Sequence, residues 1–314
     1  MSQAIPIVIC FDSESDDRQI DPRTQPEWVG LERLVPVLED WRRTFAAATG
    51  RPARYVWAVR ADPGIAHVYG HGGWAFEHYR HLWDSLAAAG DDIGLHAHPW
   101  RWQEEQGVWL ADYNEAWTEE CLRLSHAAVA EVYDRPMHSF RYGDRYMNDR
   151  IMRTLEDLGV RYDLTIEPNQ PPLPYMKLGE RTTGLTTDHR GATRKPYRPS
   201  KRNFRRPGWL SSRKVWAFPM TTGEPLGHVH GMPDNLPKCQ TLLLGTPFEA
   251  LRPIMEAALN DRDHPYLAAI VRTDVREDPF NREQFDRALD FLATHPLRRR
   301  FVIDTPESIL KLAG

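Results

Sequence analysis

Apolar residues along the chain alternate between short continuous runs and longer stretches with helical spacing. The first run, residues 5–12 (IPIVICFD), is rich in β-branched residues and ends in an acid. This pattern is typical of a buried parallel strand. The segment 26–50 keeps its apolar residues at helical spacing, so it predicts a helix that ends at Gly50, with Pro36 inside it.

The same alternation continues to the end of the chain. Further strands are expected at 53–62, 92–98, 137–144, 161–168, 214–222, 265–274 and 299–305. Further helices are expected at 77–91, 113–134, 145–160, 245–261, 281–296 and 306–314, and a loop at 67–74. Alternating strands and helices predict an α/β fold of parallel strands joined by crossover helices, in which ligands bind at the carboxyl ends of the strands.

A long region rich in proline and glycine, about 169–236, has little regular pattern outside 214–222. A segment of this kind in a compact domain is usually a functional loop or lid. Since neither an internal repeat nor a domain linker is visible, we expect one domain over 1–314. His228 and His230 fall in this region, and we expect them to form part of a rim or lid and only weakly to act as ligands.

Polar side chains gather at the ends of two predicted strands. Asp12 and Glu14 are two residues apart, as are His96 and His98, so each pair projects to one side of an extended chain. Two imidazoles and a carboxylate are a common ligand set for a divalent metal with an open position for water. The second carboxylate could then take the proton of that water. The alternative is a pair of hydrogen-bonded core histidines.

A third strand end carries Arg141, followed by Gly143, which permits a turn. Asp144 or Asn148 can then cap the next helix. An arginine beside a carboxylate cluster lowers the pKa of the carboxyl group and orients it. The alternative is a surface arginine in a turn.

The order of these motifs resembles the polysaccharide deacetylase family, also called carbohydrate esterase family four. An acidic motif closes the first strand, a histidine motif follows D-I-G, and an Arg-x-Gly motif precedes the segment LEDLGVRYDLTI. PYRPS and VWAFPMTT resemble later groove segments of the family. The similarity covers most of the chain and rests on order and spacing. It implies a distorted (β/α)7 barrel that uses a divalent metal to hydrolyse N- or O-acetyl groups on sugars.

The resemblance also implies roles for individual residues. Asp12 matches the catalytic base, Glu14 the metal-binding acid, His96 the first metal histidine and Arg141 the arginine that positions the base. The family has two adjacent aspartates where this chain has Asp-Ser-Glu. It also spaces its histidines at i and i+4, so His98 must serve as the second one here.

The last motif of the family supplies a histidine acid, and this chain departs from it. The matching segment, AAIVRTD, offers Arg272 and Asp274 instead. Asp274 could act as the general acid only if burial or a neighbouring acid raises its pKa. The alternative is that Arg272 and Asp274 form an ion pair.

Composition limits the class of protein. A net charge of −4 and a pI of about 6.4 do not indicate a nucleic-acid partner, although 194–209 is strongly basic. That stretch could contact an acidic sugar or a nucleotide-linked pyrophosphate, or be a solvated loop. The three cysteines lie far apart, and neither a signal peptide nor a membrane-spanning run is visible. We therefore expect a cytoplasmic protein with reduced thiols.

These features predict a metal-dependent amide hydrolase. The expected activity is N-deacetylation of a small-molecule or oligosaccharide substrate, a sugar of a surface polysaccharide or of its precursor. The expected cofactor is zinc, or else cobalt, nickel or iron. One alternative is an amidase of the same fold that acts on a small non-sugar amide. Another is a catalytically inactive glycan-binding module, which the altered last motif favours. The oligomeric state stays open.

Overall fold

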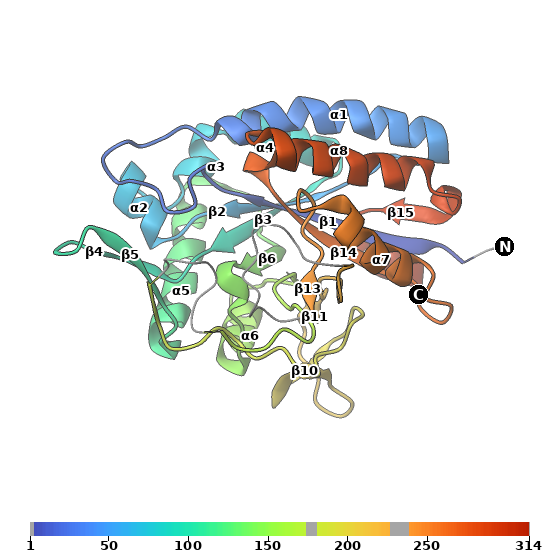
Figure 1. The fold of residues 1–314 in the computed structure, drawn as a ribbon. Coiled ribbons are helices and arrows are strands. Elements are labelled where there is room, and N and C mark those ends of the chain that lie inside the picture. The colour runs from blue at the N-terminus through green and yellow to red at the C-terminus, as the bar shows by residue number, and fades with distance from the viewer. Residues whose placement is uncertain (1–2, 174–180, 227–238, 314) are drawn as a thin grey trace.

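A curved parallel sheet forms the centre of the computed structural model, which describes residues 3–173, 181–226 and 239–313 (Figure 1). Within these residues the sheet has eight strands in the order β11-β7-β6-β3-β2-β1-β14, and β15 pairs with the start of β1. These strands are β1 (Ile5–Ser13), β2 (Val56–Arg60), β3 (Asp92–Ala97), β6 (Ser139–Tyr142), β7 (Tyr162–Asp163), β11 (Trp216–Ala217), β14 (Leu267–Arg272) and β15 (Phe301–Ile303). The predicted α/β architecture with parallel strands is confirmed.

Helices cover the outside of this sheet. Figure 1 shows α1 and α8 side by side along one flank, and α5 and α6 below the opposite flank. The helices are α1 (Val29–Thr49), α2 (Pro63–Tyr69), α3 (Trp74–His78), α4 (Arg80–Ala88), α5 (Glu115–Val132), α6 (Asp149–Asp157), α7 (Phe248–Leu259), α8 (Pro279–Thr294) and α9 (Pro306–Ala313). Of the two predicted capping residues, Asp144 and Asn148, it is Asn148 that caps α6, by accepting a hydrogen bond from the Ile151 N–H at 2.8 Å.

The sheet closes into a distorted barrel through the irregular segment that follows β11. The Met220 N–H donates to the Ile166 carbonyl at 2.8 Å, on the β7 side. The next N–H, of Thr221, donates to the Ala268 carbonyl in β14 at 2.9 Å. One short segment therefore joins the two edges of the sheet, which agrees with the predicted barrel.

Alternation along the strands separates two hydrophobic clusters. Ile7, Ile9 and Phe11 of β1 pack in the larger cluster, together with the buried faces of the helices. Val8 and Cys10 belong to a smaller cluster, formed largely by the other strands. The further members of the smaller cluster are Val56, Ala58, Tyr162, Leu164, Phe218, Met220, Tyr266, Ala268, Ile270 and Ile309. The same period of two carries on into Asp12 and Glu14, so these acids stand at the carboxyl end of the smaller cluster.

Some predicted boundaries are wrong. The expected loop at 67–74 is confined to residues 70–73, because α2 runs on to Tyr69 and α3 begins at Trp74. Asp62 caps α2 by accepting from the Ile65 N–H, and Pro63 fits the first helical turn. The strand expected at 161–168 pairs regularly only in β7. The strand expected at 214–222 pairs in β11 and, at its last residue, in β12 (Thr222–Gly223). In both, the residues beyond the short strand are held by single hydrogen bonds instead of a ladder.

Several short strands were not predicted. β4 (Trp100–Gln103) and β5 (Val108–Asp112) form a hairpin that β8 (Arg181–Thr183) extends. Two pairs lie further along the chain: β9 (Pro199–Ser200) with β10 (Asn203–Pro207), and β12 (Thr222–Gly223) with β13 (Gln240–Thr241). The described part of the region 169–236 therefore contains short strands. Its role as a lid stays a prediction, and His228 and His230 lie outside the described residues.

Two further observations concern the described residues. Cys10, Cys121 and Cys239 are free thiols. No helix in the described ranges combines the length and the apolar character that crossing a membrane requires.

We predict that Asp163 makes stability depend on pH. This side chain is fully buried, one of its oxygens has no hydrogen-bond partner among the described residues, and burial raises its pKa to about 7. An unfolded aspartate has a pKa of about 3.9. Between these two values the folded state holds a proton that the unfolded state has lost, so stability falls as pH rises towards 7.

Asp163→Asn keeps the shape and stays neutral. The free energy of unfolding of the wild type should therefore fall between pH 5 and pH 8, and that of Asp163→Asn should not show this fall. The difference between variant and wild type should grow by on the order of 2–3 kcal/mol over this range. Urea unfolding at the two pH values measures this gain. Asp290→Asn, an exposed control, should show none. An Asp163→Asn effect that is equal at both pH values contradicts the prediction.

Candidate metal site

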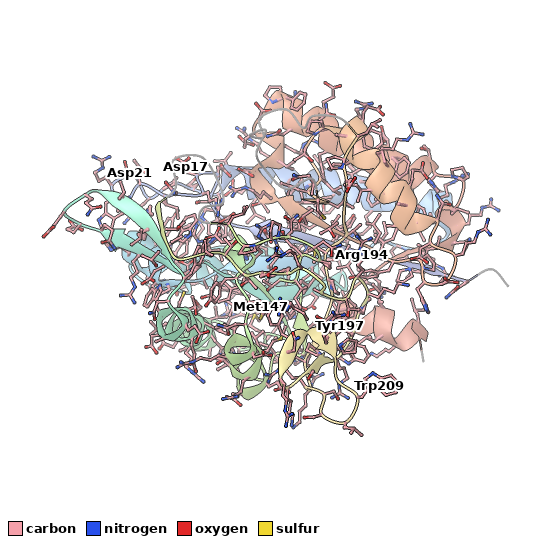
Figure 2. The ribbon with its side chains drawn as sticks, turned by 60° about the horizontal axis from the view of Figure 1, so that its bottom comes forward. Asp17, Asp21, Met147, Arg194, Tyr197 and Trp209 are labelled. Atoms are coloured by element: carbon pink, nitrogen blue, oxygen red, sulfur yellow. The ribbon has the colours of Figure 1, made fainter. Side chains whose placement is uncertain are left out.

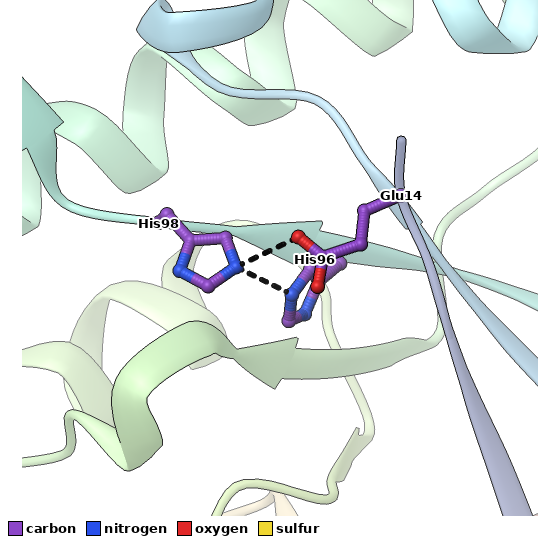
Figure 3. Close-up of side chains that lie close together, drawn as sticks. All are labelled: Glu14, His96 and His98. Carbon is purple, nitrogen blue, oxygen red and sulfur yellow. Dashed lines mark hydrogen bonds and ion pairs between the residues drawn. The ribbon is translucent and has the colours of Figure 1, made fainter. Parts of the chain in front are cut away.

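Three side chains converge at the carboxyl ends of β1 and β3. The possible ligand atoms of Glu14, His96 and His98 all lie within 4.8 Å of one another, and all three residues are buried (Figure 3). The two imidazole Nε2 atoms are 3.1 Å apart, and the His98 Nε2 is 3.2 Å from the Glu14 Oε2. Two nitrogens that bind one tetrahedral zinc at its usual bond length lie about 3.3 Å apart. The spacing therefore fits one metal ion.

The hydrogen bonds around the two histidines leave lone pairs at the centre of this group. The His96 Nδ1 is 2.8 Å from the Arg141 carbonyl, which can only accept, so Nδ1 carries the proton and Nε2 presents a lone pair. The His98 Nδ1 is 3.7 Å from an Asp144 oxygen, which favours a proton on Nδ1 there too. Burial lowers the pKa of both imidazoles. Two neutral imidazoles and a carboxylate thus meet as three acceptors, an arrangement that a cation stabilises.

The turn after β6 holds His98 in place. A Cβ atom on Gly143 would lie 2.3 Å from ring atoms of His98, so only glycine allows this approach. Asp144 follows in the left-handed region, with φ of 53°. Trp100 stands at the position where the family has its second histidine. Its ring centre lies 4.4 Å from that of His98, and its Nε1 donates to the Asp144 Oδ2 at 2.7 Å. It therefore supports His98 and takes no part as a ligand.

Asp12 and Arg141 form a buried ion pair, as the sequence predicted. The Arg141 Nε is 2.9 Å from the Asp12 Oδ1 and donates to the Oδ2 at 3.2 Å. One N–H thus faces both carboxylate oxygens, and each oxygen keeps a lone pair that can accept a proton. Burial opposes the charge on Arg141, but Asp12 and Glu167 outweigh it and raise the pKa of the guanidinium.

Glu167 was not predicted as a site residue. It accepts from the Arg141 Nη2 at 3.1 Å and from the Thr241 hydroxyl at 2.8 Å. Burial raises the pKa of Glu167, but Arg141 and Arg145 have the larger, opposite effect. The pKa is therefore below its usual value, and the carboxylate stays ionised. Arg141 is thus fixed between two carboxylates. An acid at the end of the predicted strand RYDLTIEP was the available signal in the sequence.

Arg272 and Asp274 form the ion pair that the sequence allowed as an alternative. The Arg272 Nε and Nη2 donate to the two Asp274 oxygens, each at 3.0 Å. The Arg272 Nη1 donates to the Glu14 Oε1 at 2.7 Å. Arg272 therefore bridges Asp274 to the candidate metal ligand. Asp274 lies outside the group of three, and its role as a general acid stays a prediction.

A second arginine, which the sequence did not single out, also faces Glu14. The Arg60 Nη1 is 3.4 Å from the Glu14 Oε2, and its Nε donates to Asp62 at 2.8 Å. Asp62 in turn accepts from the His98 backbone N–H at 3.0 Å. Burial raises the pKa of Glu14, but Arg272 and Arg60 hold it well below its usual value. The Oε1 is committed to Arg272, so Oε2 is the oxygen left to bind a metal.

The architecture is similar to that of two solved structures. One is a proposed glycoside hydrolase/deacetylase from Parabacteroides distasonis, 15% identical, with a TM-score of 0.58 over 99% of this chain and 71% of that one. The other is a proposed polysaccharide deacetylase from Mycobacterium smegmatis, 14% identical, with a TM-score of 0.53 over 98% of this chain and 90% of that one. No protein-family model and no curated protein matches the sequence. The chain therefore has the polysaccharide-deacetylase type of (β/α) barrel, as its motifs predicted.

We predict that Gly143→Ala weakens metal binding. The added methyl group must displace the His98 ring, so the affinity for Co²⁺ should fall by roughly 10–100-fold, as for other residues that position a ligand. Absorbance titration with Co²⁺ against a competing chelator measures the change. Gly72→Ala is the control, because its Cβ meets only side-chain and backbone atoms away from the three ligands and should leave affinity unchanged. Unaltered affinity in Gly143→Ala contradicts the proposed position of His98.

Proposed function

We propose that the chain is a metal-dependent hydrolase that removes an N-acetyl or other acyl group from a sugar of a surface polysaccharide or its precursor. The observation that carries this proposal is the convergence of the Glu14 Oε2 with the Nε2 atoms of His96 and His98. It occurs at the strand ends of a barrel of the deacetylase type, where ligands bind in such folds. The expected location in the cytoplasm stays a prediction.

The ligand set suits zinc, cobalt, nickel or iron, since it combines two imidazoles with one carboxylate. When bound, such a metal would polarise a carbonyl group and lower the pKa of a bound water to about 7. Glu14 holds its place through Arg272 and Arg60, and His96 through the Arg141 carbonyl. These contacts fix Glu14 and His96 before a metal binds.

Asp12 is the proposed general base. The Arg141 Nε lies 2.9 Å from its Oδ1 and donates to its Oδ2 at 3.2 Å, and the carboxylate keeps lone pairs that can accept a proton. The carboxylate accepts a proton from the water that attacks the carbonyl carbon. Glu167 fixes the far side of Arg141, so the carboxylate of Asp12 is oriented before the substrate arrives. Asp12 thus transfers the proton, and Arg141 positions the Asp12 carboxylate that accepts it.

The leaving group of an amide needs a proton before the C–N bond breaks. Asp274 is the acid that the sequence predicts, and one observation argues for a different role: both of its oxygens accept from Arg272. In that role Asp274 positions Arg272, which in turn holds Glu14. Asp12 can then return to the leaving nitrogen the proton that it took from water.

Asp12→Asn should keep metal and lose activity by roughly 10²–10⁴-fold, because it retains the shape and removes the proton acceptor. The assay is acetate release from acetamido sugars, both free and nucleotide-linked, with metal content measured in parallel. Asp17→Asn, an exposed acid in the following loop, is the matched control and should leave activity unchanged. Loss of metal together with activity would make Asp12 a ligand, and full activity in Asp12→Asn would exclude it as the base.

The roles of Asp274 predict different results for Asp274→Asn. A general acid would cost roughly 10²–10⁴-fold in kcat and remove the alkaline limb of the pH profile. An ion-pair partner of Arg272 should cost less than about tenfold, keep the pH profile and weaken metal affinity through Glu14. The geometry leads us to expect the second result. Steady-state kinetics across pH, together with Co²⁺ titration, separate the two.

An inactive glycan-binding module is the second candidate. It is favoured by the ion pair in which both Asp274 oxygens accept from Arg272. Such a module would bind acetylated oligosaccharides and release no acetate from any of them, with metal bound. Turnover of a small non-sugar amide, without turnover of sugars, would instead indicate an amidase of the same fold.

A further inference from the structure

The segment 197–216, here called the basic arm, has two apolar side chains that are fully exposed to solvent. It contains β9, β10 and the turn that follows them. At this turn Trp209 is 96% exposed and Leu210 is 105% exposed. Figure 2 shows Trp209 at the outer edge of the molecule, with Tyr197 of the same arm further in. Single exposed apolar residues are common, but a tryptophan and a leucine side by side at a projecting turn are not.

The backbone of the arm holds this pair outward. The Gly208 N–H donates to the Arg198 carbonyl at 2.9 Å, and the Lys201 N–H donates to the Ser211 carbonyl at 3.1 Å. Arg213 is buried and ties the arm to α6 through Glu156, at 3.0 Å. The turn is therefore bonded on both sides of Trp209 and Leu210. The hydrogen-bonded backbone of the turn therefore holds both side chains in their exposed positions.

Positive charge surrounds the exposed pair. Residues 191–223 contain no acidic side chain, although the whole chain carries a net charge of −4. Lys201, Arg202, Arg206 and Lys214 are exposed, and none of them forms an ion pair with another described residue. The free charges and the apolar pair thus lie on the same short segment.

We propose that the turn of the basic arm docks on the interface of a membrane that contains anionic lipid. Tryptophan favours the headgroup level of a bilayer, and leucine gains free energy on entering the hydrocarbon below it. Exposed lysine and arginine are attracted to the negative surface of such a membrane. A polyanion such as an acidic glycan or a nucleic acid would engage the cations and could stack on Trp209. It would offer nothing to Leu210, which is why lipid is the occupant that fits the whole surface.

Vesicle flotation tests this proposal with the full chain. The protein should float with vesicles of phosphatidylcholine mixed with phosphatidylglycerol, and not with phosphatidylcholine alone. Trp209→Ala/Leu210→Ala and Arg202→Glu/Arg206→Glu should each weaken binding by roughly tenfold or more. Two variants are the matched controls: Leu124→Ala/Leu312→Ala for exposed leucines, and Arg262→Glu/Arg282→Glu for exposed arginines. Both controls should bind as the wild type does.

Tryptophan fluorescence provides a second readout. All eleven tryptophans lie in the described residues, and Trp209 is the one that is exposed. Binding should therefore shift the emission to the blue, and Trp209→Phe should remove the shift while it keeps flotation. The proposal is overturned if the protein fails to float with anionic vesicles at low salt. It is also overturned if Trp209→Ala/Leu210→Ala binds as well as the wild type, since the cations then act alone on any polyanion.

Discussion

Glu14 is a carboxylate with 3% of its surface exposed, and the site depends on how its charge is compensated. A buried ion costs several kcal/mol unless partners replace its water. Arg272 takes one oxygen at 2.7 Å, while the other faces Arg60 and His98. Because the two arginines hold the pKa of Glu14 low, the carboxylate stays ionised beside two neutral imidazoles. That combination of a charge and two lone pairs makes the position suitable for a metal.

The barrel brings these groups together through its strand register. Arg272 of β14 lies opposite Asp12 of β1, and in the neighbouring strands His96 lies between Arg60 and Arg141. Asp12 and His96 thus each lie opposite an arginine on an adjacent strand. One layer below, the same strands present Val8, Cys10, Ala58 and Ala268, so the polar layer rests on an apolar one. The apolar layer excludes water from beneath the site, which strengthens each ion pair in it.

The sequence was sufficient for the parts that follow from local periodicity. A period of two along a strand places Asp12 and Glu14 on one side of the chain, and likewise His96 and His98. Strands that alternate with helices are parallel, so the carboxyl ends that carry the two pairs lie at the same edge of the sheet. Arg60 and Glu167 could not be assigned in this way, because their roles come from partners on other strands. The hairpin of β4 and β5 was missed because its two strands are only four and five residues long. Gly143 was read as a turn residue, and its close contact with the His98 ring is visible only in three dimensions.

A bound metal ion at Glu14, His96 and His98 is the central claim. Elemental analysis of protein purified without chelator, combined with anomalous diffraction at the absorption edge of the metal found, tests it most directly. We expect close to one divalent ion per chain, an anomalous peak between the three side chains, and loss of both signals in His96→Ala/His98→Ala. A wild-type protein that binds no divalent metal, or a peak away from these residues, would contradict the claim.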